Sequence, residues 1–296
     1  MKQGIFALLI VGILCSFSIG HKTSIRAAYA SSEVEITSSK FGNKVYKMIT
    51  MNRSNQRIKA KYFAFKEGGL NVYDRYQRWK TGKDIVLISS GTYIDLESYK
   101  QANFVPEGLT IDNGKIVNEK TTDKFDGFVI VYATGGIAVA NIKEQKVNIT
   151  CNGQPKSYDI KNNTFDRQEF IACAKDVEAT TFQTHLLAFK DQPKVGLNGS
   201  QNKASRRFLA ACKMGGVLYH VIVHTDEEQT LSQAALDAFD FLKKFKEMDE
   251  VIFMINLDTG MQNVFELYDE RGNKRNDIVG KTPAEKATNL LVYYYE

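Results

Sequence analysis

Short apolar runs separated by turn residues are the dominant pattern along this chain. Lys44–Thr50, Lys59–Phe65 and Asp84–Ser90 have the length and composition of strands. Three later pairs of apolar runs each flank a glycine-containing turn. Because Asn and Gly tolerate positive φ, each pair predicts a β-hairpin. The turns are Asp112-Asn113-Gly114, Thr134-Gly135-Gly136 and Met214-Gly215-Gly216.

Helical periodicity is confined to a few segments. Thr230–Glu247 carries an apolar stripe at helical spacing, and Thr230 with Gln233 fits a capping box at its start. Arg167–Glu178 and a short segment that begins at Thr282-Pro283 are the other predicted helices. The later segments predicted to be extended are Thr181–Phe189, Val251–Asn256 and Leu290–Tyr294.

Strand patterns outnumber helical ones, and the two do not alternate regularly. This predicts an α+β fold with mixed β-sheets, built largely from hairpins and packed with a few helices. The sequence contains no internal repeat or linker, so residues 44–296 are expected to form a single domain. Residues 31–43 are polar and rich in serine, and we expect them to form a flexible N-terminal segment.

Residues 1–30 have the pattern of a signal peptide. Lys2 precedes an apolar run from Ile5 to Ile19, and Ala28-Tyr29-Ala30 offers a small-x-small cleavage site. A transmembrane anchor is the alternative, but it normally needs about 20 apolar residues. A lipid anchor at Cys15 is disfavoured by the bulky Leu14 before it. The pattern predicts a secreted or periplasmic protein with no transmembrane segment in the mature chain.

Composition excludes few classes of protein. The chain has 296 residues, 43% hydrophobic and 25% charged, which is enough for a sizeable core. Its net charge of +5 includes no long basic run, so no nucleic-acid partner is predicted. Signal cleavage would leave Cys151, Cys173 and Cys212, an odd number without CxxC spacing. One disulfide can form among them, but the sequence assigns neither its partners nor the oligomeric state.

The stretch Val251–Gly260, VIFMINLDTG, has the strongest functional pattern. Its five consecutive apolar residues predict a strand buried on both faces, which ends abruptly in Asn256, Asp258 and Gly260. Polar groups held just past a buried strand are common at functional sites. The alternative is that Asp258 and Thr259 only shape a turn into the next strand.

Other polar residues are weaker candidates. The apolar run within Asp84–Ser90 also ends in small polar residues followed by glycine, Ser89-Ser90-Gly91. Arg206-Arg207 opens a predicted strand, where a guanidinium can bind an anionic oxygen or lie solvated at a sheet edge. His220 and His224 would stand about 13 Å apart at ~3.3 Å per strand residue, too far to share a zinc ion. We expect no metal and no cofactor.

Taken in order, five stretches of this sequence resemble the motifs of the phosphodiester glycosidase family. The family pattern begins with Asn-Gly-Gly-Phe-Phe at a strand end and a Pro-Val-Gly hairpin. It continues with Gln-Ser/Thr-Gly-Pro, an Arg that opens a strand, and Asn/Tyr-Leu-Asp-Gly-Gly. The stretches here are Ser89-Ser90-Gly91-Thr92-Tyr93, Pro106-Glu107-Gly108, Gln183-Thr184-His185-Leu186, Arg206-Arg207 and Asn256-Leu257-Asp258-Thr259-Gly260.

The resemblance covers roughly residues 84–270, with departures at several positions. Ser89 replaces the family Asn, His185-Leu186 replaces Gly-Pro, and Thr259 replaces the first Gly after the Asp. The positions that match are Gly91, Gly108, Gln183, Arg207 and Asp258.

The resemblance implies cleavage of a sugar–phosphodiester linkage at the anomeric carbon. Asp258 and Arg207 would be the catalytic residues, with Asp258 at the anomeric centre and Arg207 on the phosphate. Phosphate is already a good leaving group, so neutralising its charge matters more than protonating it. No second carboxylate is carried over. The residues expected to bind substrate are Ser89, Ser90, Gly91, Gln183, His185, Arg206, Asn256 and Gly260.

These expectations favour an exported glycoside hydrolase. Its substrate would be a glycosyl-1-phosphate diester or a related cell-envelope or exopolysaccharide glycan. The altered motifs favour an alternative, a catalytically inactive carbohydrate-binding or envelope-associated protein on the same fold. The retained Asp258 and Arg207 favour the enzyme.

Overall fold

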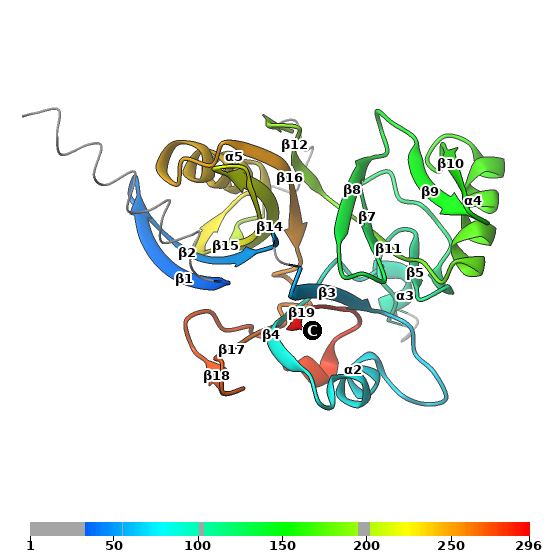
Figure 1. Cartoon of the computed structure of the whole chain (residues 1–296), viewed down its shortest axis with the longest axis horizontal. Coiled ribbons are helices and arrows are strands. Elements are labelled where there is room, and N and C mark those ends of the chain that lie inside the picture. Colours follow the sequence, from blue (N-terminus) through cyan, green and yellow to red (C-terminus); the bar gives the residue numbers. More distant parts are fainter. Residues whose placement is uncertain (1–32, 55, 101–103, 195–201) are drawn as a thin grey trace, which may run out of the picture.

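The predicted hairpins form, and they assemble into three larger β-sheets and a two-stranded ribbon (Figure 1). The structure is a computed structural model that describes residues 33–54, 56–100, 104–194 and 202–296. The predicted signal peptide lies outside these residues. Strands take 45% and helices 18% of the structure, which confirms the α+β class. Among the described helices, none is long and apolar enough to cross a membrane.

The largest sheet contains the strands that carry Arg207 and Asn256. Its order is β1-β2-β15-β14-β16-β12-β13, so β16 lies in the sheet interior between β14 and β12. One face of this sheet packs on helix α5 and the other faces the central core, which explains the unbroken apolar run of β16. These elements are β1 (Val34–Phe41), β2 (Lys44–Asn52), β12 (Leu186–Phe189), β13 (Gln192–Pro193), β14 (Ala204–Met214), β15 (Val217–Gln229), β16 (Glu250–Leu257) and α5 (Leu231–Asp240).

The second sheet has the order β18-β17-β4-β19-β3. One face contributes to the central core, and helix α2 covers the other. In Figure 1, α2 lies below this sheet, and α5 lies across the molecule above the largest sheet. The elements are β3 (Ile58–Phe63), α2 (Val72–Lys80), β4 (Asp84–Ser89), β17 (Phe265–Tyr268), β18 (Lys274–Arg275), the 3₁₀ helix η2 (Ala284–Lys286) and β19 (Leu290–Tyr295).

The third sheet has the order β6-β5-β11-β7-β8, and its outer face is covered by helix α4 and the β9–β10 ribbon (Figure 1). All three larger sheets therefore turn one face to a common core and carry a helix on the other. The elements are α3 (Leu96–Lys100), β5 (Thr110–Asp112), β6 (Lys115–Asn118), β7 (Gly127–Val131), β8 (Ile137–Asn141), β9 (Val147–Cys151), β10 (Gln154–Tyr158), α4 (Thr164–Asp176) and β11 (Thr180–Thr184).

The N-terminal end differs from the sequence prediction. Val34–Phe41 forms strand β1 instead of a flexible segment, and it pairs with β2 along its full length. The serine-rich composition of this segment does not predict a strand. The strand forms because it pairs with β2, and such pairing cannot be read from local composition.

Three further elements differ in existence or bounds. Helix α2, with a capping box between Asn71 and Asp74, and the β9–β10 hairpin were not predicted. Helix α4 begins after Asn163, whose side chain accepts two backbone N–H bonds, rather than after Asp166. The predicted helix Thr230–Glu247 ends as α5 followed by a π-helical turn, η1 (Phe241–Phe245).

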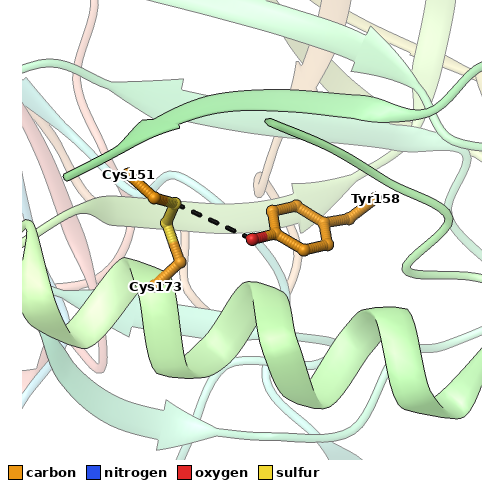
Figure 2. Close-up of a disulfide and its surroundings, with 3 residues drawn as sticks. All are labelled: Cys151, Tyr158 and Cys173. Carbon is orange, nitrogen blue, oxygen red and sulfur yellow. Dashed lines mark hydrogen bonds between the residues drawn. A yellow bond between two sulfur atoms is a disulfide. The ribbon is translucent and has the colours of Figure 1, made fainter. Parts of the chain in front are cut away.

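A disulfide fixes the outer layer of the third sheet. Cys151 at the end of β9 bonds to Cys173 on α4, and Tyr158 of β10 lies beside the pair, as Figure 2 shows. Among the described residues, Cys212 is the free cysteine, and it is buried. The sequence left the pairing among the three cysteines open, and the fold decides it by bringing the ribbon onto α4.

We expect the double substitution Cys151→Ser/Cys173→Ser to lower the free energy of unfolding by about 3 kcal/mol, because the bond closes a loop with a sequence separation of 22. Urea denaturation of the parent and variant measures this. Unchanged stability, or a non-reducing peptide map without a Cys151–Cys173 peptide, would contradict the pairing.

Candidate functional site

The candidate site lies where β16 ends, in the turn that Asp258 begins. Oδ1 of Asp258 accepts the backbone N–H of Gly260 at 2.7 Å, and Oδ2 accepts that of Gln262 at 3.3 Å. The Thr259 hydroxyl donates to the carbonyl of Ser205 at 2.7 Å, which ties the turn to the start of β14. Asp258 therefore shapes the turn, as the alternative interpretation of the sequence required, and its side chain is only 1% exposed.

The buried carboxyl of Asp258 is electrostatically unusual. Burial raises its pKa to about 6, although the two backbone N–H donors and the charges of Arg207 and Arg206 lower it. A carboxyl with this pKa can hold or release a proton near neutral pH, as general acid–base chemistry requires. The same residue thus combines a structural role with the properties of a reactive group.

Arg207 lies on β14, directly opposite Leu257 of β16, and it is completely buried. Its Nη1 donates to the carbonyl of Val264 at 3.2 Å, and its Nη2 donates to Oδ1 of Asn263 at 3.1 Å. The guanidinium carbon stands 4.3 Å from the ring centroid of Phe265. These contacts hold the segment that follows the Asp258 turn, which is a role that the sequence did not reveal.

The complete burial of Arg207 disagrees with its predicted role as a phosphate-binding residue. Burial lowers its pKa to about 9, so the guanidinium is still charged at neutral pH. It makes no ion pair with Asp258 within 4.0 Å, and its charge acts on the carboxylate through space. With no exposed surface, Arg207 cannot contact a phosphate in this conformation.

Arg206 is the more accessible of the two arginines, because neighbouring strand residues point to opposite faces. Its Nε donates to the carbonyl of Gln229 at 3.0 Å, and its Nη2 donates to that of Asn202 at 2.8 Å. Its charge acts on both Asp258 and Tyr93. Among the described residues, Arg206 is therefore the arginine placed to meet an anionic ligand near Asp258.

Asn256, His185 and Tyr93 gather beside the same strand end. The backbone N–H of Asn256 donates to the carbonyl of His185 at 3.1 Å, and its Nδ2 donates to the Tyr93 hydroxyl at 2.5 Å. The rings of Tyr93, His185 and Phe125 contact one another. Tyr93 belongs to one of the five motifs, but the sequence did not predict it as a site residue.

Burial leaves polar atoms of this site without protein partners. Burial lowers the pKa of His185 to about 4, so its ring is neutral at physiological pH. His185 Nδ1, Asn256 Oδ1 and Arg207 Nε are buried and have no hydrogen-bond partner among the described residues. Such atoms are rare in folded proteins and concentrate where a ligand or water completes the bonding.

The other residues predicted to bind substrate, Gln183 and the stretch Ser89-Ser90-Gly91, are buried and make hydrogen bonds to other segments of the chain. Gln183 is fully buried and uses its amide on the backbone of Leu109, Thr122 and Phe125. Its carboxamide oxygen lies so close to Gly108 that a Cβ there would stand 2.7 Å away, which explains why this position is Gly. Gln183 therefore crosslinks loops instead of offering a free amide to a ligand.

The stretch Ser89-Ser90-Gly91 is also buried. The Ser90 hydroxyl donates to the carbonyl of Gln262 and accepts from the N–H of Val264 at 3.0 Å. The N–H of Gly91 donates to Oδ1 of Asn289 at 2.8 Å. The carbonyl of Val264 accepts hydrogen bonds from both Ser90 and Arg207, so this stretch helps to hold the segment that follows the Asp258 turn.

His220 and His224 both lie on β15, as predicted, and each has its own partner. Nδ1 of His220 lies 2.9 Å from the Tyr293 hydroxyl, and Nε2 of His224 lies 2.8 Å from Asp226 Oδ1. The described residues contain no cluster of three or more His, Cys, Asp or Glu that could hold a metal.

A large open groove of about 1170 Å³ lies elsewhere on the protein. It is bounded by β1, by the turn between α2 and β4, and by the β17–β18 hairpin. None of the ten predicted site residues lines it. The groove is therefore separate from the candidate site at Asp258.

Comparison with known proteins supports the fold. No protein-family model and no curated protein matches this sequence. A solved structure of the zebrafish N-acetylglucosamine-1-phosphodiester alpha-N-acetylglucosaminidase catalytic domain, auto-inhibited by pro-peptide, is similar, with a TM-score of 0.50 and 14% identity over 90% of this chain and 84% of that chain. A hypothetical protein from Synechocystis aligns with a TM-score of 0.45 and 10% identity over 89% of this chain and 62% of that chain. The first similarity shows a distantly related, glycosidase-like fold.

The raised pKa of Asp258 predicts a specific dependence of stability on pH. Its folded-state value of about 6 lies above the ordinary 3.8, so the folded protein binds the extra proton between these values. Asp258 therefore stabilises the fold below about pH 4, and this contribution is lost as the pH rises to about 6. The lowered pKa values of His185, His220 and His224 act in the opposite direction.

We therefore compare Asp258→Asn with the parent, because the histidines contribute equally to both. Between pH 4 and pH 7 the variant should gain about 2 to 3 kcal/mol in unfolding free energy relative to the parent. Urea titrations at several pH values measure the difference. Glu119→Gln, which removes an exposed carboxylate, is the control and should show no such gain. A constant difference between Asp258→Asn and the parent would refute the raised pKa.

Proposed function

We propose that this protein hydrolyses a glycosyl phosphodiester and that Asp258 acts at the anomeric carbon. The observation that carries the proposal is a buried carboxyl with a pKa of about 6, placed at a strand end within the field of two arginines. A fold like that of a phosphodiester glycosidase domain supports the same activity. Gly260, whose N–H donates to the buried carboxylate, is itself exposed, so Asp258 is bonded directly to a surface residue.

The two arginines have different roles in this proposal. Arg206, which is partly exposed, binds the phosphate and neutralises the charge that develops as the sugar–oxygen bond breaks. Arg207 acts as a positioning residue: it holds the backbone after the Asp258 turn and keeps the carboxylate more acidic than burial alone would make it. Asp258, with a pKa near neutrality, serves as a base or nucleophile when ionised.

A second carboxylate is available beside Tyr93. The backbone N–H of Glu107 donates to the carbonyl of Tyr93 at 2.8 Å, and the Glu107 carboxylate pairs with Lys124 at 2.6 Å. Its charge acts on the Tyr93 hydroxyl, as that of Asp258 does. Since glycoside cleavage generally uses two carboxylates, Glu107 is the partner that we assign to Asp258.

We further propose that the protein is exported and acts on a cell-envelope or exopolysaccharide glycan. The N-terminal sequence pattern supports export, and so does the Cys151–Cys173 disulfide, because disulfides persist mainly in oxidising compartments.

A non-catalytic glycan-binding protein is the second candidate. The contacts that favour it are those of Asp258, whose two oxygens are already bonded to its own turn. Measured turnover of a nitrophenyl diester of a sugar 1-phosphate separates the two candidates.

If the protein is an enzyme, Asp258→Asn should lower kcat/KM by about 10² to 10⁴, because an amide preserves shape but cannot act as base or nucleophile. The same variant is expected to fold, since the Asn oxygen can still accept the Gly260 N–H. Circular dichroism confirms folding beside the rate assay. A folded Asp258→Asn protein with the parent rate would remove Asp258 from the mechanism.

Arg206→Ala should lower kcat/KM by about tenfold to a hundredfold through loss of the phosphate contact. Arg78→Ala, on the exposed face of α2, is the matched control and should retain the parent value. Equal rates in all three proteins would show that Arg206 does not bind the phosphate.

A further inference from the structure

The ring of Tyr93 is held in place from several sides. It stacks on Phe125 with a centroid distance of 5.4 Å and meets the edge of His185 at 5.6 Å. Its backbone carbonyl accepts the N–H of Glu107, which anchors the loop that carries it. The side chain is partly exposed, whereas Asn256 and Asp258 beside it are buried. Tyr93 is therefore less deeply buried than the two polar residues beside it.

The hydrogen bonds of Asn256 determine what the Tyr93 hydroxyl can do. Nδ2 of Asn256 donates to the Tyr93 oxygen at 2.5 Å and to the carbonyl of Leu257 at 3.1 Å, and the second bond fixes the orientation of the amide. The Tyr93 oxygen is thus an acceptor toward Asn256, and its own hydrogen is not used there. Among the described residues, none accepts that hydrogen. The hydroxyl hydrogen is therefore available for donation to an incoming group.

The electrostatic neighbours of the hydroxyl suggest which group that is. The charges of Asp258, Arg206 and Glu107 all act on Tyr93, so its side chain lies near two carboxylates and the accessible arginine. Phosphate oxygens only accept hydrogen bonds, and a fixed donor beside a guanidinium suits them. Burial also raises the pKa of Tyr93 above its ordinary value, so the hydroxyl keeps its proton.

We propose that Tyr93 binds a non-bridging phosphate oxygen of the substrate, together with Arg206, and that Asn256 orients its hydroxyl. This inference rests on the proposed function, and it assigns a residue that the motif resemblance does not supply. The corresponding position in the family pattern is Phe, which has no hydroxyl. The contact would therefore be a property of this chain, compensating for a direct phosphate contact that the buried Arg207 does not make.

Tyr93→Phe tests the proposal, because it removes the hydroxyl and leaves the ring that packs on Phe125 and His185. Two readouts are needed: hydrolysis of a nitrophenyl diester of glucose 1-phosphate, and calorimetric binding of glucose 1-phosphate and of glucose. Tyr132→Phe, which removes the hydroxyl of a residue that is 47% exposed, is the matched control. We expect Tyr93→Phe to lower both kcat/KM and the affinity for glucose 1-phosphate by about tenfold to a hundredfold. Its affinity for glucose and its melting temperature should match those of the parent.

The outcomes separate this inference from the proposed function. If the parent binds glucose 1-phosphate without hydrolysing the diester, and Tyr93→Phe weakens that binding, the Tyr93 contact stands and the hydrolase proposal falls. If the parent hydrolyses the diester and Tyr93→Phe is unchanged in both readouts, Tyr93 is not a phosphate ligand. Equal loss of affinity for glucose and glucose 1-phosphate would place the contact on the sugar, and a parent that neither binds nor hydrolyses would overturn both proposals.

Discussion

A single buried guanidinium organises the candidate site. Arg207 has no exposed surface, and a charge in such a place is stable only when the protein supplies its hydrogen bonds. Asn263 and Val264 accept two hydrogen bonds from the guanidinium, and its carbon stands 4.3 Å from the ring centroid of Phe265, so the segment after the Asp258 turn is fixed relative to β14. Ser90 binds the same Val264 carbonyl through its backbone N–H at 3.1 Å, which adds β4 of the second sheet to the arrangement. One charge therefore joins two sheets at the point where the candidate carboxylate lies.

This arrangement divides the site into a buried layer and an accessible one. Arg207, Asp258 and Asn256 are buried, and they set charge and orientation. Tyr93, His185 and Arg206 are partly exposed. The opposing effects of burial and of the arginines leave Asp258 with a pKa of about 6, between that of an ordinary carboxyl and that of a permanently protonated one. Asp258 therefore combines a structural role in the turn with a pKa close to neutrality.

Local patterns predicted most of the fold. The apolar run of β16, the glycine turns of the hairpins and the N-cap of α5 each act within a few residues, and all of them form. The predicted capping box at Thr230 forms only in part, because the Gln233 side chain donates to Asp237 instead of the N-cap backbone. Strand β1 was missed because its stability comes from pairing with β2 and not from its own residues. The disulfide was left open because three pairings were compatible with the sequence, and only the packing of β9–β10 on α4 selects one.

The site was harder to predict for geometrical reasons. A strand sends Arg206 and Arg207 to opposite faces, but the sequence does not say which face is buried, and the resemblance favoured the arginine that the fold makes inaccessible. Gln183 matched a motif, yet its amide is used on the backbone of Leu109, Thr122 and Phe125, which lie about 58 to 74 residues away in sequence. Tyr93 was overlooked as a site residue because its contact with Asn256 joins positions separated by 163 residues.

Burial and the two arginines together hold the pKa of the Asp258 carboxyl at about 6. Carbon-detected NMR of the side-chain carboxyl, followed as a function of pH in the folded protein, measures its pKa directly. We predict a value of about 6 in the parent and a higher value in Arg207→Gln, where one positive charge is removed. A pKa at or below the ordinary 3.8, or one that does not respond to loss of Arg207, would contradict the account.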